Sequence, residues 1–253
     1  LRSRLKDDYA PATANKMLCA LRGVMLQAWK LGYIDAEEYN RIKSVKGVGG
    51  STVITGRALT PAEIAAMLKV CADDDTPAGA RDGALIVLLR AGGLRRAEMC
   101  SLTLDDYDRV NQVLLVHGKG NKQREVPLNN DVRAALADWL DVRGDALGTL
   151  FCAVNKSGKV TVKGSLSPQS IYNAVMKRAD QSGVKHLSTH DFRRTFVGDL
   201  LDAGADISTV QKLVGHANVT TTQRYDRRGE ESKREAVKLL HVPYKVRKHA
   251  AAR

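Results

Sequence analysis

The sequence predicts a mainly α fold with a small antiparallel β-sheet. Apolar residues recur at three- and four-residue spacing through most of the 253 residues, as they do along the buried face of a helix. A short apolar run at 113–116, a glycine turn and a returning segment at 124–128 predict one hairpin. The length suits one large domain or two smaller ones, and a hydrophobic content of 43% is enough for a packed core.

The first predicted helix covers residues 11–31. Gly32 closes it, and Lys16, Arg22 and Lys30 lie around its polar side. That side is either a solvated basic face or a surface for an anionic partner. The apolar positions recur at helical spacing, at Met17, Leu18, Leu21, Val24, Met25, Ala28 and Trp29.

Residues 47–57 predict an interdomain linker. They are rich in glycine and small polar residues and show no apolar periodicity. The glycines do not form the GxxxxGK[ST] pattern of a phosphate-binding loop, so the segment does not indicate nucleotide binding.

A second group of helices begins at a capping box. Thr60 and Glu63 stand at the N-cap and N3 positions, with proline between them, and predict a helix to about residue 70. A helix over 78–90 is apolar on most sides and should be the buried centre of its domain. The glycines at 92 and 93 end this helix in a turn that suits anion binding. Arg95, which follows the turn, is the predicted anion-binding arginine, and Arg96 is the alternative. Glu98 is expected to be a buried structural partner.

The predicted hairpin has a basic tip. Lys119, Lys122 and Arg124 are expected on a mobile loop that could reach an anionic partner, although a basic turn is more often simply solvated. A lysine ammonium can deliver a proton, which an arginine does not readily do. The pattern then predicts a helix over 130–142, a strand over 150–154 and a helix that begins at residues 167–168.

The last third of the chain predicts three helices in succession. An N-cap at Thr189 or the residue before it places His190 and Arg193 in a first helical turn, on one face. A second helix starts near residue 206 and presents His216 at its end. A third, short helix is expected to carry Tyr225.

Two histidines, an arginine and a tyrosine without a carboxylate cluster suit an anionic, phosphate-like substrate. Arginine binds phosphate oxygens in a bidentate manner, histidine transfers protons near neutral pH, and tyrosine can act as a covalent nucleophile. Each residue alone is more often structural. The ordered set favours a common site.

These residues resemble the conserved blocks of the tyrosine recombinases, the phage integrase family. The H-x-x-R of His190 and Arg193, the L-V-G-H that ends at His216, and Tyr225 nine positions later are similar to the second block. The sequence AGGLRRAE at 91–98 resembles the first block, and GKGNKQR at 118–124 resembles the hairpin that carries the catalytic lysine. The resemblance implies six catalytic residues: Arg95, Lys119, His190, Arg193, His216 and the nucleophile Tyr225.

The resemblance also implies the domain organisation. Residues 58–240 would form the catalytic domain, and residues 1–46 the C-terminal part of the helical core-binding domain that clasps DNA, with the rest of that domain missing from this chain. Residues 241–253 would be a basic tail. A helix predicted over 230–240 either covers its own core or docks into a neighbouring subunit.

The implied activity is site-specific recombination of double-stranded DNA, of the integrase, transposase or resolvase type. It would proceed through a 3′-phosphotyrosyl intermediate and a Holliday junction held by a homotetramer, without metal, ATP or another cofactor. Lys122, Arg124 and Arg194 are the expected DNA contacts. Two alternatives are a nicking-closing topoisomerase of type IB and a catalytically silent DNA-binding protein on the same scaffold.

Composition agrees with a polyanionic partner. The formal net charge is +12, although solvated lysines alone can give such a value. The four cysteines form no CxxC pair and predict buried, reduced thiols rather than disulfides or zinc ligands. No apolar run reaches the 18 residues that a membrane span needs. We expect a cytoplasmic protein that associates with the bacterial nucleoid when bound to DNA.

Overall fold

The computed structural model describes residues 1–50, 56–118, 120, 122–223, 225, 226, 237, 238 and 243, with the backbone alone at residue 163. The chain separates into two compact units, Leu1–Thr55 and a second unit that begins at Gly56. Each unit has its own apolar core.

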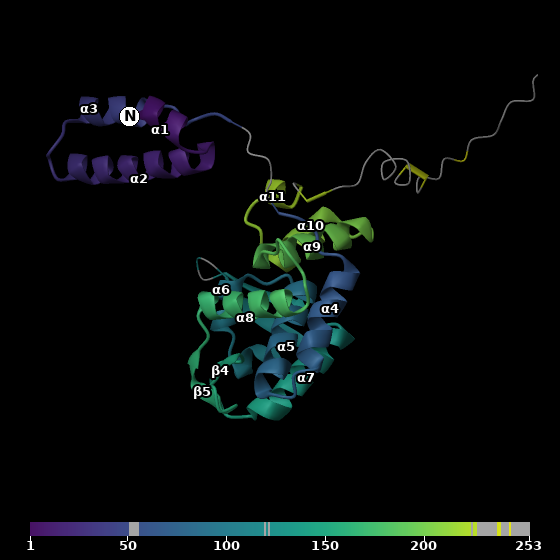
Figure 1. Ribbon diagram of the computed structural model, residues 1–253. Helices are drawn as coiled ribbons and strands as arrows, with labels where there is room; N and C mark the ends of the chain where they lie inside the picture. Colours follow the sequence, from purple (N-terminus) through teal and green to yellow (C-terminus); the bar gives the residue numbers. More distant parts are fainter. Residues whose placement is uncertain are drawn as a thin grey trace, which may run out of the picture. The chain divides into compact units, whose positions relative to one another are not determined.

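The first unit contains three helices (Figure 1): α1 (Arg2–Asp8), α2 (Pro11–Lys30) and α3 (Ala36–Ser44). The predicted helix over 11–31 is confirmed as α2, with proline at its start and Gly32 at a φ of +79° after its end. The core is small, and the side chain of Asn15 exchanges two hydrogen bonds with the backbone of Val48. These bonds hold the segment after α3 along α2.

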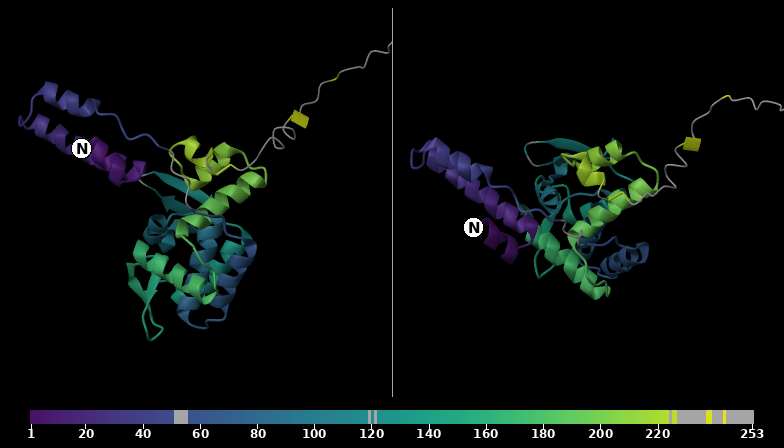
Figure 2. Two further views of the ribbon diagram at one scale, coloured as in Figure 1. Left: turned by 45° about the horizontal axis from the view of Figure 1, so that its top comes forward. Right: turned by 90° about the horizontal axis from the view of Figure 1, so that it is seen from above.

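The second unit is built around α5 (Pro77–Ala91). This helix contacts α4 (Pro61–Ala72), α7 (Asn130–Arg143), α8 (Pro168–Gln181) and α9 (Thr189–Asp202), which surround it in Figures 1 and 2. The predicted buried helix is thus confirmed, with Leu85, Ile86, Leu88 and Leu89 all at 0% exposure. The capping box of Thr60 and Glu63 is also confirmed at the start of α4.

Two small antiparallel sheets flank these helices. The first has the order β1 (Tyr107–Asp108), β2 (Val113–His117) and β3 (Gln123–Pro127), and β2 with β3 forms the predicted hairpin. The second pairs β4 (Cys152–Val154) with β5 (Val160–Ser165). The predicted strand over 150–154 therefore begins later than expected. Its partner β5 was not predicted, because its lysine, glycine and serine weaken the strand pattern.

Short elements complete the second unit. The helix α6 (Arg96–Ser101) follows Gly92 and Gly93, and the 3₁₀ turn η1 (Leu104–Asp106) precedes β1. After α9 come α10 (Ile207–Val214) and α11 (Val219–Gln223), and α9 and α10 share a second apolar cluster. Tyr225 packs against that cluster.

The C-terminal part of the chain differs from the prediction at Tyr225 and is described only in part beyond it. Tyr225 does not lie on the third short helix: α11 ends at Gln223, and Tyr225 stands in the turn after it, with its N–H donated to the carbonyl of Thr222 at 3.0 Å. The helix predicted over 230–240 and the tail over 241–253 fall outside the described residues, apart from positions 237, 238 and 243.

In the described part of the chain, no helix has both the length and the apolarity that a bilayer crossing requires. The four cysteines are free thiols, but only Cys71 and Cys152 are buried, whereas Cys100 is partly buried and Cys19 is exposed. The prediction of buried thiols is therefore wrong for Cys19. Among the described residues, no group of three or more His, Cys, Asp or Glu side chains could hold a metal ion.

Candidate active site

Arg193 is the most deeply buried cation of the site. It is the fifth residue of α9, just after the first turn, and 2% of its surface is exposed. Its Nη1 donates to the carbonyl of Gly93 at 2.7 Å, and its Nη2 donates to the carbonyl of Val214 at 2.6 Å. Burial, and next the charge of Arg95, lowers the pKa of Arg193 to about 9. The guanidinium is still protonated at neutral pH, and an anion placed beside it would relieve this desolvation.

Gly93 allows the approach that fixes Arg193. Its φ is +58°, and a Cβ there would lie 2.4 Å from a ring carbon of Phe196 on α9. Any larger residue would push the turn away from α9 and move the Gly93 carbonyl away from Arg193. The glycine turn before Arg95 therefore also positions Arg193, because the Gly93 carbonyl accepts a hydrogen bond from it.

Arg95 is the N-cap residue of α6 and is tied to a buried carboxylate. Its Nη1 donates to Glu98 at 2.6 Å, and its Nη2 donates to the carbonyl of Gly215 at 3.3 Å. Its side chain remains 42% exposed, whereas that of Glu98 is 5% exposed. Burial alone would raise the pKa of Glu98, but hydrogen bonds from Arg124 and from Arg95 hold that pKa below its ordinary value. Glu98 is thus a buried structural partner, as predicted.

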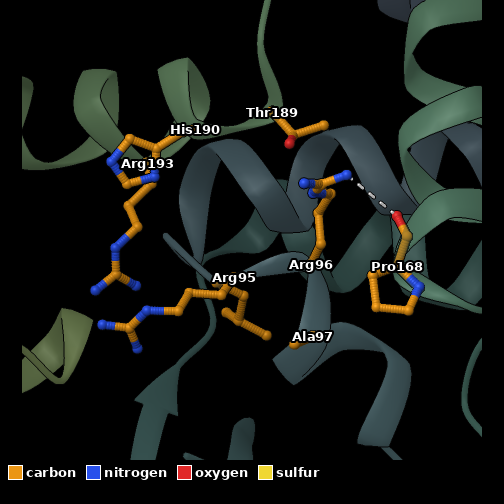
Figure 3. A pocket seen from close by; sticks show the side chains of 8 residues that line it. Arg95, Arg96, Ala97, Pro168, Thr189, His190 and Arg193 are labelled. Atoms are coloured by element: carbon orange, nitrogen blue, oxygen red, sulfur yellow. Dashed lines mark hydrogen bonds between the residues drawn. The ribbon is translucent and has the colours of Figure 1, made fainter. Parts of the chain in front are cut away.

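Arg95 and Arg193 face the same hollow from different elements. Figure 3 shows the two guanidinium groups next to each other, whereas Arg96 turns toward α8. The hollow has a volume of about 300 Å³. Arg96 donates to the carbonyl of Pro168 at 3.4 Å and lies 5.3 Å from the ring centroid of Tyr172. This orientation supports the choice of Arg95 over Arg96. The residues that line the hollow are Leu94, Arg95, Arg96, Ala97, Pro168, Thr189, His190 and Arg193.

His190 lies beside the candidate nucleophile. Its Nε2 is 3.0 Å from the hydroxyl of Tyr225. Burial, followed by the positive charges of Arg193 and Arg194, lowers the pKa of His190. The imidazole is therefore neutral at physiological pH and can accept a proton from a phenol at hydrogen-bond distance.

His216 follows the left-handed turn at Gly215, whose φ is +66°. Its backbone is held on both sides by Gln211, and its Nδ1 lies 2.9 Å from the hydroxyl of Thr222. Its ring is 6.2 Å from that of Tyr225, with an interplanar angle of 22°. Burial and then the charges of Arg193 and Arg95 lower the pKa of His216 to about 4.

The expected DNA contacts differ in their surroundings. Lys122 is exposed and lines a larger cavity of about 810 Å³ that also includes Arg95 and His216. Arg194 donates to the carbonyl of Gly56 at 3.0 Å, and its guanidinium lies 5.5 Å from the ring centroid of Tyr225. Lys119 falls outside the described residues.

Arg124 does not lie on the hairpin loop, so that part of the prediction was wrong. It is a residue of β3 opposite Val116, and its side chain is only 12% exposed. Its Nη2 donates to Glu98 at 2.8 Å, and its Nε donates to the carbonyl of Leu213 at 2.8 Å. The strand register turns this side chain inward, where it ties β3 to Glu98 and to the end of α10.

The structure thus brings five of the six predicted catalytic residues together and leaves Lys119 undescribed. The sequence did not indicate Thr222, Gln211 or the two carbonyls that hold Arg193. No sequence pattern shows that a threonine in a short helix, or a backbone carbonyl, will hold a side chain of the site.

Comparisons with known proteins show the family to which the chain is similar. The phage integrase family model matches residues 57–231. The tyrosine recombinase XerC of Corynebacterium glutamicum is 32% identical over 231 residues, which cover 91% of this chain and 72% of that protein. XerC of Myxococcus xanthus is 33% identical over 229 residues, which cover 87% of this chain and 73% of that protein.

Solved structures show the same fold. The XerH site-specific recombinase bound to its difH substrate, in a pre-cleavage complex, matches with a TM-score of 0.67 at 22% identity, over 93% of this chain and 68% of that chain. The Tn1549 transposon integrase in complex with transposon right end DNA also matches with a TM-score of 0.67, at 19% identity, over 94% of this chain and 83% of that chain. Together with the family match and the XerC relatives, these findings establish that the chain belongs to the phage integrase family and is a tyrosine recombinase.

Proposed function

We propose that this recombinase cuts and rejoins double-stranded DNA at specific sites through a 3′-phosphotyrosyl intermediate at Tyr225. The observation that carries the proposal is the 3.0 Å distance between the Tyr225 hydroxyl and His190 Nε2, beside a hollow lined by two arginines. A nucleophile, a proton acceptor and a phosphate-binding pair therefore come from separate segments of the chain to one place.

Arg95 and Arg193 would bind the non-bridging oxygens of the scissile phosphate. Their guanidinium groups face the same hollow, and neither is free to leave it, because Glu98 anchors Arg95 and two carbonyls anchor Arg193. Negative charge grows on these oxygens in the transition state. A preorganised donor of this kind supplies about 3 kcal/mol of barrier reduction. His216 would donate a further hydrogen bond to a phosphate oxygen.

His190 would accept the proton of Tyr225 as the phenolic oxygen attacks phosphorus. A phenol has an ordinary pKa of about 10, so it is mostly protonated at pH 7 and needs such a base. The new bond joins the tyrosine oxygen to phosphorus, and the bond from phosphorus to the 5′-oxygen breaks. Lys119 would give the departing oxygen its proton, since its described neighbours Gly118 and Lys122 line the cavity beside Arg95.

The phosphotyrosyl bond retains the energy of the phosphodiester, so the chemistry needs neither ATP nor a metal ion. Attack by the 5′-hydroxyl of a partner strand would reverse the step on that strand. Two rounds, through a Holliday junction held by a homotetramer, would complete recombination. This would take place in the cytoplasm, on DNA of the bacterial nucleoid.

The two units would divide the work of DNA binding. Residues 1–46 would act as part of a core-binding domain, residues 47–57 as a linker, and residues 58–240 as the catalytic domain. Lys122 and Arg194 would contact DNA directly. The inward position of Arg124 assigns it a supporting task instead.

A nicked suicide substrate from the native locus of the gene tests the proposal. Wild-type protein should form a covalent adduct that survives denaturing electrophoresis, with or without a chelator. Tyr225→Phe should bind the same DNA and form none. Adduct in the Tyr225→Phe variant would place the nucleophile elsewhere. Relaxation of a supercoiled plasmid that carries only one site would favour the topoisomerase alternative.

A further inference from the structure

Thr222 connects the segment that bears the proposed nucleophile to His216, which lines the larger cavity beside Arg95. Its side chain is wholly buried, at 0% exposure, and its Oγ1 lies 2.9 Å from His216 Nδ1. Its backbone carbonyl accepts the N–H of Tyr225 at 3.0 Å. One residue of α11 therefore contacts both groups, through two different atoms.

The contact at Nδ1 bears on the tautomer of His216. A neutral imidazole carries one N–H, on either Nδ1 or Nε2, and a threonine hydroxyl can donate or accept. Within the described residues, this buried hydroxyl has no other hydrogen-bond partner, so its proton is available to Nδ1. If Nδ1 accepts that proton in a hydrogen bond, the imidazole proton stays on Nε2.

Only the Nε2–H form of His216 suits a phosphate. The oxygens of a phosphodiester accept hydrogen bonds and cannot donate them, so a bare Nε2 would face them with a lone pair. The ring itself has little freedom, because Gln211 holds the backbone of His216 and Tyr225 lies against the ring. What remains to be fixed is whether the N–H proton of the neutral His216 ring is on Nδ1 or on Nε2.

We propose that Thr222 is a positioning residue that fixes the Nε2–H tautomer of His216 while α11 is docked. His216 then donates to the scissile phosphate only when Tyr225 is in its attacking position, because the same threonine holds both. The inference rests on the proposed function and adds a residue that couples the nucleophile to the phosphate site. The lowered pKa of His216 agrees with it, since the tautomer matters only for a neutral ring.

The tautomer can be measured directly. In the DNA-free protein at neutral pH, the ¹⁵N chemical shifts of His216 should show a protonated Nε2 and an unprotonated Nδ1. Thr222→Ser keeps the hydroxyl and should keep this pattern, whereas the isosteric Thr222→Val should shift the ring toward a mixture of tautomers. A protonated Nδ1 in the wild-type protein would overturn the proposal without any variant.

Single-turnover cleavage of the nicked substrate at saturating protein tests the consequence. Thr222→Val should cleave about tenfold more slowly, the effect of one lost hydrogen bond to a group in the site. Thr222→Ser should recover most of the rate. Thr221→Val makes the same chemical change one residue earlier, where the hydroxyl has no hydrogen-bond partner in the described part of the chain, and it should cleave like the wild type.

A double-mutant cycle separates positioning from packing. In a His216→Ala background, Thr222→Val should cause no further loss, because the threonine acts through the histidine. An equal tenfold loss in both backgrounds, or a wild-type rate for Thr222→Val alone, would overturn the proposal. If the wild type forms no adduct at all, the proposed function fails, but the ¹⁵N measurement still decides whether Thr222 sets the tautomer.

Discussion

The two halves of the proposed active site are attached to the fold in different ways. The proposed phosphate-binding half consists of Arg193, Arg95 and Glu98, and two of these three are almost wholly buried. The nucleophile half consists of His190 and Tyr225, and Tyr225 stands just after the five-residue helix α11. His216 lies between the two halves, with its ring against that of Tyr225. The first half is held by charged hydrogen bonds and backbone carbonyls. Among the described residues, Tyr225 is held by one side-chain hydrogen bond, one backbone hydrogen bond and packing against the second apolar cluster.

This difference suits the proposed chemistry. The charged groups that stabilise the transition state must be in place before the reaction, and a rigid, buried framework holds them in position. A nucleophile that forms and later breaks a covalent bond benefits from a weakly held segment, because local opening there costs little free energy. Damage to the first half should therefore cost both catalysis and stability, whereas damage to the second half should cost catalysis with little loss of stability.

The largest effect is expected at Arg193. Arg193→Ala removes a transition-state donor and leaves the carbonyls of Gly93 and Val214 without that partner. Cleavage of the suicide substrate should fall by about 10²–10³-fold. Each buried carbonyl left unpaired costs about 1–3 kcal/mol, so urea denaturation should also show a clear loss of stability.

Tyr225→Phe is the matched control for Arg193→Ala, because it acts in the other half. It should abolish the adduct while the urea midpoint stays close to that of the wild type. A variant of Arg193 with normal stability would contradict the contrast between the two halves.

The second largest effect is expected at Glu98, which the mechanism does not use directly. Glu98→Gln keeps the shape but leaves Arg95 and Arg124 without their carboxylate. Removal of one member of a buried ion pair costs about 3–5 kcal/mol, and the urea midpoint should fall accordingly. Glu63→Gln, in the capping box of α4, offers a control for which the loss should be smaller, because its carboxylate is 25% exposed and its partner Arg57 is 33% exposed. Equal losses in the two variants would show that Glu98 is not a framework residue.

The sequence predicts much of this framework, for identifiable reasons. Helix starts are visible because Thr60 with Glu63 and the N-cap position before Thr189 are local signals that the fold retains. The site residues are visible as an ordered set of residue types. The threonines at 220–222 predict the N-cap of a helix that includes Tyr225, but α11 ends at Gln223, two residues before it. A helix boundary is the least certain feature of any such pattern.

The error at Arg124 has a different cause, and the sequence contained the signal that could have avoided it. Residues two apart share one face of a strand, so Arg124 shares the face of Val126, which is 1% exposed. The alternation is hard to see because the basic residues from 119 to 124 continue from the turn into β3. The carbonyl partners of Arg193 could not be predicted in this way, since they depend on how three elements meet in space.

A moderate effect is expected from acid, through His216. Its pKa is about 4 in the folded protein, against an ordinary value of about 6.5 in an unfolded chain. The unfolded state therefore binds more protons between these values, and the free energy of unfolding should fall as the pH drops from about 6.5 to about 4. Urea titrations across this range measure the decline.

His216→Ala supplies the comparison for the acid effect. Its stability should depend less on pH in the same window, because one group with a lowered pKa has been removed. His186→Ala, at a histidine outside the active site, should retain the wild-type slope. An unchanged slope in His216→Ala would show that this ring does not account for the pH dependence.

The smallest effect, a change in salt dependence, compares Lys122 with Arg124, two cations of the same hairpin. Lys122 is exposed, and we expect it to neutralise one DNA phosphate, so Lys122→Ala should reduce the slope of log K against log salt by about 0.9. Arg124 is occupied by Glu98 and the carbonyl of Leu213, so Arg124→Ala should leave that slope unchanged and lower the urea midpoint instead. Filter binding over a range of salt concentrations, with Lys69→Ala on α4 as a surface control, measures the slopes. The opposite result, a changed salt slope with an unchanged urea midpoint in Arg124→Ala, would mean that the Arg124 side chain leaves Glu98 and binds DNA. The phosphate-binding half would then not be the fixed framework that its contacts indicate.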